Sequence, residues 1–189
     1  MSTPVLLWDG RKVDASTYLK LKVLEQRTGA RPVVVQGSYN GGGVAASGGT
    51  HDGGGVVDLS IRSLPLGMSP REYVRRARSS GLVAWYRTEA DGFAPHIHAI
   101  DLGSKTLSPA AARQVDSWRR GRNGLANNGP DSGPKVVIPE RVPMSNVKQA
   151  RELIQYALDG PAARVPRRRR AARTMFAAIR AALKTGPKA

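Results

Sequence analysis

The chain has no cysteine among its 189 residues. Disulfide bonds, cysteine-bound zinc and thiol catalysis are therefore excluded, and a metal ion would have to be bound by histidine, aspartate or glutamate. Histidine is scarce as well, with three residues in the whole chain. Long apolar runs are also missing: no segment of about 18 apolar residues is available to span a bilayer, so we expect no integral membrane protein.

Residues 1–10 lack the charged start, the apolar stretch and the small-residue cleavage site of a secretory signal. We therefore expect synthesis to end in the cytoplasm. The length allows one domain of catalytic size with a small appendage.

The formal charge of +16 is unevenly distributed along the chain. Residues 1–110 carry 13 basic and 9 acidic side chains, residues 111–160 carry 8 and 5, and residues 161–189 carry 9 and none. A basic block of this kind favours an anionic partner, but charge alone does not choose between nucleic acid, lipid headgroups and bacterial wall polymer.

Caps and apolar periodicity predict an α+β fold. Three helix starts are marked by a capping residue: Asp14 or Ser16, Ser69 before Pro70, and Ser108 before Pro109. The first of these helices, over residues 13–26, is expected to end at Gly29. We expect four strands, at 33–35, 56–61, 82–87 and 96–102, that form a small antiparallel sheet.

Two of these strands carry a prediction about burial. The β-branched run at 33–35 is suited to a buried strand. In the strand at 56–61, alternation of side chains places Asp58 on the face opposite Val57, Leu59 and Ile61, which are expected to face the core.

Composition divides the chain into three parts. Residues 1–122 form the predicted domain, and residues 123–144, rich in Gly, Asn, Pro and Asp, are interpreted as a linker or long surface loop. Residues 145–189 are predicted to form a pair of basic amphipathic helices.

All three histidines lie in two short segments. His96 and His98 are two residues apart on a predicted strand, so their side chains project from the same face. His51 and Asp58 are joined by a loop with three consecutive glycines, whose conformational freedom permits both side chains to turn toward one site. Two imidazoles and a carboxylate, with a fourth position left to water, are a ligand set for catalytic zinc, which lowers the pKa of a bound water to about 7.

The spacing of these residues resembles that of the D-alanyl-D-alanine metallopeptidase family. This family includes the L-alanyl-D-glutamate endopeptidases of phage endolysins and shares its zinc site with lysostaphin and hedgehog domains. Its first motif matches His51, Gly54, Val56 and Asp58, and its second motif, His-x-His on a strand, matches His96 and His98. The resemblance covers about the first 120 residues. It implies a hedgehog-like α+β fold, one Zn²⁺ ion bound by His51, Asp58 and His98, and His96 close to the reacting carbonyl.

The chain also departs from the family pattern. Many members have serine two residues before the first ligand, where this chain has Gly49, with Ser47 and Thr50 nearby as substrate-binding candidates. Many have an arginine after the first strand that polarises the scissile carbonyl, and here Tyr39 stands at about that place.

Two further candidates follow from these departures. Gln36 is an alternative hydrogen-bond donor to Tyr39 for substrate. Some relatives have a general base three residues before the last ligand, where this chain has Pro95. His96 is therefore the preferred base and Asp91 the weaker candidate.

The resemblance implies a hydrolase that cuts an amide bond of the peptidoglycan stem peptide, in the manner of a bacteriolytic phage endolysin. Such an enzyme, made in the cytoplasm, acts at the cell wall after its release. We expect a monomer. In this interpretation the basic C-terminal helix adheres to anionic wall polymer or to a membrane surface.

Several alternatives remain open at this stage. The chain is alternatively a basic protein that binds nucleic acid or a membrane surface and has a structural or vestigial metal site. Nucleic acid is less favoured, since Phe176 is the lone aromatic residue of the basic stretch and gives no stacking platform. The glycine loop lacks the Gly-Lys-Ser/Thr ending of a phosphate-binding loop. For the basic tail, a solvated helix packed on its neighbour is the alternative interpretation.

Overall fold

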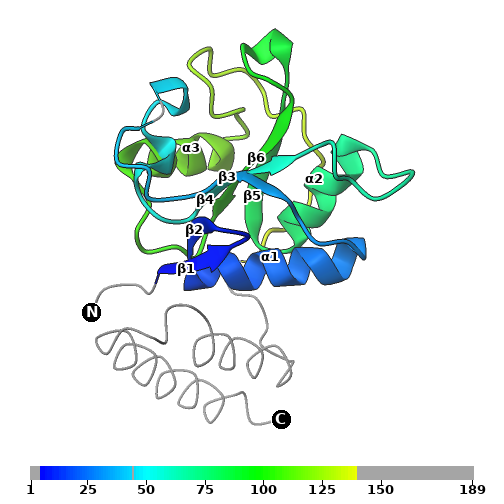
Figure 1. Ribbon diagram of the computed structural model, residues 1–189. Helices are drawn as coiled ribbons and strands as arrows, with labels where there is room; N and C mark the ends of the chain where they lie inside the picture. Colours follow the sequence, from blue (N-terminus) through cyan, green and yellow to red (C-terminus); the bar gives the residue numbers. More distant parts are fainter. Residues whose placement is uncertain (1–4, 44, 140–189) are drawn as a thin grey trace, which may run out of the picture. The chain divides into compact units, whose positions relative to one another are not determined.

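A computed structural model of the chain describes residues 5–43 and 45–139. The fold is α+β, with three α-helices and two small antiparallel sheets (Figure 1). The strands are β1 (Val5–Trp8), β2 (Arg11–Asp14), β3 (Val34–Gln36), β4 (Val56–Ser60), β5 (Leu82–Arg87) and β6 (His96–Asp101). The helices are α1 (Ala15–Thr28), α2 (Pro70–Ser79) and α3 (Pro109–Arg119), and the short 3₁₀ helices are η1 (Ala45–Ser47), η2 (Thr50–Asp52) and η3 (Glu89–Asp91). None of the helices within these ranges is long and apolar enough to cross a membrane.

The predicted helix starts are confirmed. Asp14, Ser69 and Ser108 each accept a hydrogen bond from a backbone N–H in the first turn of the helix that follows. This satisfies a donor that has no partner within the helix itself. At the other end of α1, Gly29 adopts the left-handed conformation (φ 75°), and its N–H donates to the carbonyl of Glu25.

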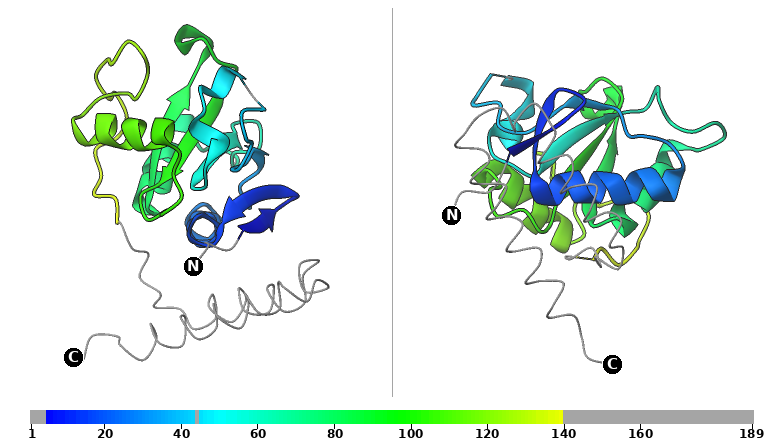
Figure 2. Two further views of the ribbon diagram at one scale, coloured as in Figure 1. Left: turned by 90° about the vertical axis from the view of Figure 1, so that its left-hand side faces the viewer. Right: turned by 60° about the horizontal axis from the view of Figure 1, so that its bottom comes forward.

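The main sheet has the order β3-β4-β6-β5, and all of its neighbouring strands are antiparallel. Helix α1 lies on one face, where Lys20 and Thr17 bond to Asp101 at the end of β6. Helix α3 covers the opposite face. Ile100 precedes Asp101 in β6, so its side chain points to the other side of the sheet, where it packs with Val115 of α3. Figure 2 shows α1 and α3 on different sides of the strands.

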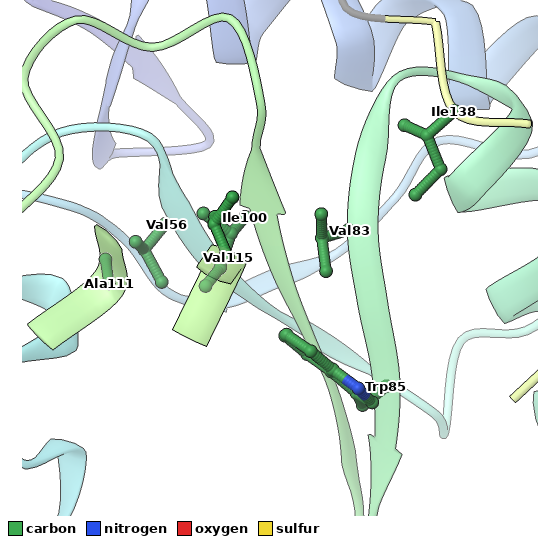
Figure 3. Close-up of a cluster of buried hydrophobic side chains, with 7 residues drawn as sticks. All are labelled: Val56, Val83, Trp85, Ile100, Ala111, Val115 and Ile138. Carbon is green, nitrogen blue, oxygen red and sulfur yellow. The ribbon is translucent and has the colours of Figure 1, made fainter. Parts of the chain in front are cut away.

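The core beneath α3 contains apolar residues of the strands β4, β5 and β6 (Figure 3). Its buried members are Val56, Val83, Trp85, Ile100, Ala111, Val115 and Ile138. The alternation predicted for β4 is right in placing Asp58 opposite Leu59. Both faces of β4 are nevertheless buried, because helices cover both sides of the sheet.

The strand prediction at 33–35 is wrong about burial. Val34 is buried, but Val33 and Val35 are 43% and 45% exposed. The reason is topological: β3 is an edge strand of the sheet, so part of its surface faces solvent.

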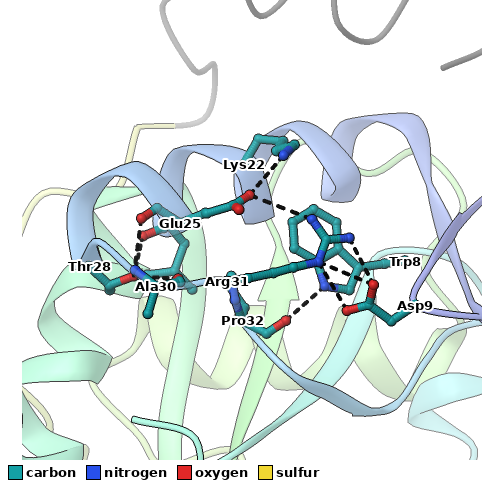
Figure 4. A network of polar contacts seen from close by, with 9 residues as sticks. Trp8, Asp9, Lys22, Glu25, Thr28, Ala30, Arg31 and Pro32 are labelled. Atoms are coloured by element: carbon teal, nitrogen blue, oxygen red, sulfur yellow. Dashed lines mark hydrogen bonds and ion pairs between the residues drawn. The ribbon is translucent and has the colours of Figure 1, made fainter. Parts of the chain in front are cut away.

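The β1–β2 hairpin was not predicted from the sequence. Its turn is Asp9-Gly10, with positive φ at both positions (48° and 82°), as a tight hairpin turn requires. The hairpin is fixed to the start of β3 by a polar network (Figure 4), in which Arg31 forms hydrogen bonds with Asp9 and lies 4.0 Å from the ring centroid of Trp8. The indole Nε1 of Trp8 donates to the carbonyl of Pro32 at 2.8 Å.

The predicted domain boundary after residue 122 is too early. The first compact unit runs from Met1 to Val142, and Ile138 belongs to its core. Residues 123–139 contain no helix or strand, but Asp131 is buried in an ion pair with Arg78, which attaches this segment to α2. The predicted linker is therefore a packed surface loop as far as the structure describes it. The predicted basic helices at 145–189 lie outside the described residues.

Candidate metal centre

The face of the sheet that carries the α3 core also carries the candidate site. Antiparallel pairing sets Asp58 opposite His98, and His98 opposite Trp85. The next row places His96 opposite Arg87. Paired residues project to the same side of a sheet, so the apolar half of this face, under α3, passes directly into a polar half.

His51 reaches the site from outside the sheet, on the short helix η2. The loop after it passes very close to other segments: a Cβ atom on Gly54 would lie 2.2 Å from the hydroxyl oxygen of Thr106, and one on Gly53 would lie 2.3 Å from the Thr106 carbonyl. Any side chain at these two positions would therefore clash with Thr106. The hydroxyl of Ser108, the cap of α3, also donates to the carbonyl of Thr50 at 3.1 Å, which ties η2 to α3.

His51, Asp58 and His98 form a compact group in which each residue offers one ligand atom, and these atoms all lie within 4.8 Å of one another. Asp58 Oδ1 is 3.3 Å from His51 Nε2 and 2.8 Å from His98 Nδ1. All three residues are buried. This group can hold a metal ion. Within residues 5–43 and 45–139, no other group of three or more His, Asp or Glu residues meets the same distance condition.

Each ring has an acceptor oxygen on its outer side, which allows the outer nitrogen to carry the proton. His51 Nδ1 lies 2.9 Å from the Gly37 carbonyl, and His98 Nε2 lies 2.8 Å from the amide oxygen of Gln114. Both oxygens only accept, so these two nitrogens donate in the tautomer that can bind a metal ion. In the neutral rings the inner nitrogens are left with lone pairs that face the Asp58 carboxylate. Three acceptors that face one another are suited to a cation at their centre.

The electrostatics of the group agree with this arrangement. Burial by itself raises the pKa of Asp58, but the combined influence of the neighbouring His51 and His98 rings outweighs burial and holds that pKa well below its usual range. Burial is the largest influence on the pKa of His98 and lowers it, and the pKa stays below its ordinary value although Asp58 acts to raise it. At neutral pH the group therefore combines a carboxylate with neutral His98, the protonation states that metal binding requires.

The group opens onto a cavity of about 680 Å³. His96 lies on its wall: His96 Nδ1 is 2.7 Å from the carbonyl of Ala94, so its Nε2 is the free acceptor, 3.6 Å from Asp58 Oδ1. The predicted substrate-binding residues Gln36, Ser47 and Thr50 line the same cavity. Gln36 Nε2 is buried without a hydrogen-bond partner in the described part of the chain, which makes it an available donor.

Two predicted site residues lie elsewhere. Tyr39 does not line the cavity: its hydroxyl is 3.2 Å from Thr106 Oγ1, behind the glycine loop, and it packs against Gly54. Asp91 caps η3 by accepting a hydrogen bond from the N–H of Thr88 at 3.1 Å. Neither residue lines the cavity: Asp91 fixes a local turn, and Tyr39 contacts Thr106, which is 67 residues away along the chain.

Two residues of the site were missed by sequence reasoning. Gln114 comes from α3, 16 residues after His98, and Arg87 comes from β5. Arg87 ends the predicted strand at 82–87, but its place opposite His96 follows from the register of the two strands, which the sequence did not predict. Gln114 had no signal either, because its contact depends on how α3 crosses the sheet.

A comparison of the chain with family models, with curated proteins and with solved structures finds no match in any of the three.

Proposed function

We propose that this protein is a zinc-dependent peptidase that hydrolyses an amide bond of the peptidoglycan stem peptide. The observation that carries the proposal is the convergence of two imidazole lone pairs and one carboxylate oxygen on the wall of an open cavity. The His51, Asp58 and His98 donors suit Zn²⁺, which binds nitrogen and oxygen ligands and keeps an open position in catalytic sites. The spacing of the two sequence motifs supports the choice of substrate.

Zinc bound by these three residues would supply Lewis-acid polarisation of the scissile carbonyl and a water of lowered pKa. The chain's own residues perform the remaining tasks. Hydrolysis adds a water oxygen to the carbonyl carbon, breaks the C–N bond and transfers a proton to the leaving nitrogen. His96 Nε2 is the free acceptor beside the group, so it is placed to take the water proton and to return it to the leaving amine.

The rest of the cavity wall serves substrate binding in this proposal. Gln36 offers an unused amide N–H₂, and Phe93 adds an aromatic surface next to His96, with ring centroids 5.9 Å apart. In the cell, the enzyme would act on the wall after release, and the basic residues at 161–189 would adhere to anionic wall polymer or a membrane surface.

The test is clearing of purified bacterial cell walls by the full chain in a gel. Clearing is expected with zinc, and it should be lost with chelator and in Asp58→Asn. Asp52→Asn is the matched control, because Asp52 lies on the same loop but bonds to the backbone N–H of Gly42. Walls that stay intact, together with a shift in DNA mobility, would favour a basic nucleic-acid-binding protein instead.

A further inference from the structure

Arg87 is a nearly buried cation in the wall of the cavity. It ends strand β5 opposite His96, and the residue is 4% exposed. Its guanidinium carbon lies 4.8 Å from the ring centroid of Trp85, and that ring is stacked on His98 at 6.2 Å. The arginine is therefore one aromatic ring away from a residue of the metal centre, on the same face of the sheet.

This guanidinium has no counter-ion within the described residues. Within residues 5–43 and 45–139 its one hydrogen bond is from an Nη2–H to the carbonyl of Asn123, at 2.8 Å, and no carboxylate of that part of the chain lies within 4.0 Å. Burial lowers the pKa of Arg87 to about 10, against the opposing effect of Asp91, Asp58 and Asp131, so the side chain is still charged at neutral pH.

The contrast with Arg78 shows how unusual this is. Arg78 is equally buried, but its guanidinium bonds to both carboxylate oxygens of Asp131, at 2.9 and 3.0 Å, and to two backbone carbonyls. A buried charge without such compensation is costly, and buried cations are normally paired. Arg87 lines the cavity, and most of its five N–H donors have no partner among the described residues.

We propose that Arg87 binds a carboxylate of the substrate, on the leaving-amine side of the scissile bond. The proposal rests on the proposed peptidase function and specifies its substrate class: an amide whose nitrogen is attached to a carbon bearing a free α-carboxylate. A planar guanidinium matches a carboxylate in bidentate fashion. A C-terminal D-alanine presents such a group, and so does a D-glutamate that is joined onward through its γ-carboxyl.

The position of Arg87 agrees with this assignment. The carboxylate of such a substrate is three bonds from the scissile carbonyl carbon. Arg87 is the direct cross-strand neighbour of His96, which would deliver the proton to the leaving nitrogen. Arg62 also lines the cavity, but it is exposed, and solvent weakens an ion pair there.

The test compares two synthetic stem peptides that differ only in this group, one with the free α-carboxylate and one with a carboxamide. The zinc-loaded full chain should cleave the carboxylate peptide with a kcat/KM about ten- to a hundredfold higher, mostly through KM. Arg87→Gln should remove this preference, Arg87→Lys should keep part of it, and Arg62→Gln should retain it. The comparison of the two peptides uses the unaltered chain, so its result does not depend on whether a variant folds.

A second readout separates this inference from the proposed function. Calorimetry with chelator-treated chain should show tighter binding of the carboxylate peptide, and Arg87→Gln should abolish the difference. Equal cleavage of both peptides, or a preference that survives in Arg87→Gln, would overturn the role of Arg87 while the peptidase stands. If neither peptide is cleaved, the peptidase fails, and the calorimetric preference alone then decides for or against Arg87.

Discussion

Two buried carboxylates in this domain, Asp131 and Asp58, differ in the partners that surround them. Asp131 is closed: Arg78 contacts both of its oxygens, the N–H of Gly133 donates to it, and Lys135 lies 3.4 Å away. Asp58 is open: its neighbours are the imidazoles of His51 and His98, at 3.3 and 2.8 Å, and it borders a cavity. One carboxylate therefore has a permanent cation as its partner, whereas the other belongs to a group that could hold a metal ion.

The largest effect is expected from breaking the closed pair. Asp131→Asn leaves the Arg78 charge buried without a counter-ion, and the free energy of unfolding should fall by about 3–5 kcal/mol in urea titration. Asp116→Asn is the control, because Asp116 pairs with Arg119 at the surface, at 3.1 Å with both side chains about half exposed, and should change stability little. Equal losses in the two variants would show that burial of the Arg78 pair does not matter.

The same pair has a pH signature. Burial raises the pKa of Asp131, but the Arg78 hydrogen bond and charge outweigh burial and leave that pKa below its ordinary value. Its stabilising contribution is thus fully present above the unfolded pKa, near 3.8, and is lost as pH falls through the lower folded pKa. Asp131→Asn should remove this part of the acid dependence of unfolding.

For Asp58 we expect a smaller effect on the free energy of unfolding, and one that depends on added metal. Zinc at a hundred times its dissociation constant should raise the free energy of unfolding of chelator-treated protein by about 2.7 kcal/mol. The increment should vanish in Asp58→Asn and persist in Asp131→Asn, measured by thermal unfolding with and without zinc. An increment that survives in Asp58→Asn would place the ion elsewhere and remove the contrast between the two carboxylates.

The features that were predictable from sequence depend on residues close together along the chain. The helix starts at Asp14, Ser69 and Ser108 were predictable because a cap acts within one turn of the chain. The shared face of His96 and His98 followed from strand alternation. The Asp9-Gly10 turn carried a usable hairpin signal that was missed.

The failures have a different physical origin. Asp91 and Tyr39 were assigned to the site by their distance along the chain, but their side chains satisfy nearby backbone and hydroxyl groups instead. The packing of residues 123–139 depends on the buried Arg78–Asp131 pair, which joins positions 53 residues apart. No local pattern predicts a contact of that kind.

The smallest expected effect concerns Gln114, the residue that holds His98 from outside the group. Its amide oxygen lies 2.8 Å from His98 Nε2, where acceptance of the Nε2–H would leave Nδ1 to bind metal. Gln114→Ala should weaken zinc affinity about ten- to a hundredfold, measured by competition with a chromogenic chelator. Gln26→Ala, an exposed glutamine of α1, is the matched control.

Gln114→Glu distinguishes orientation from packing. A carboxylate accepts the same Nε2–H more strongly and makes the imidazole more basic, so this variant should bind zinc at least as tightly as the unaltered chain. If Gln114 acted only by filling space between α3 and β6, the conservative Glu substitution and the Ala truncation would differ in stability and not in zinc affinity. Retained affinity in Glu with loss in Ala would therefore assign the outer hydrogen bond to the metal centre, as the counterpart of the bond from His51 to Gly37.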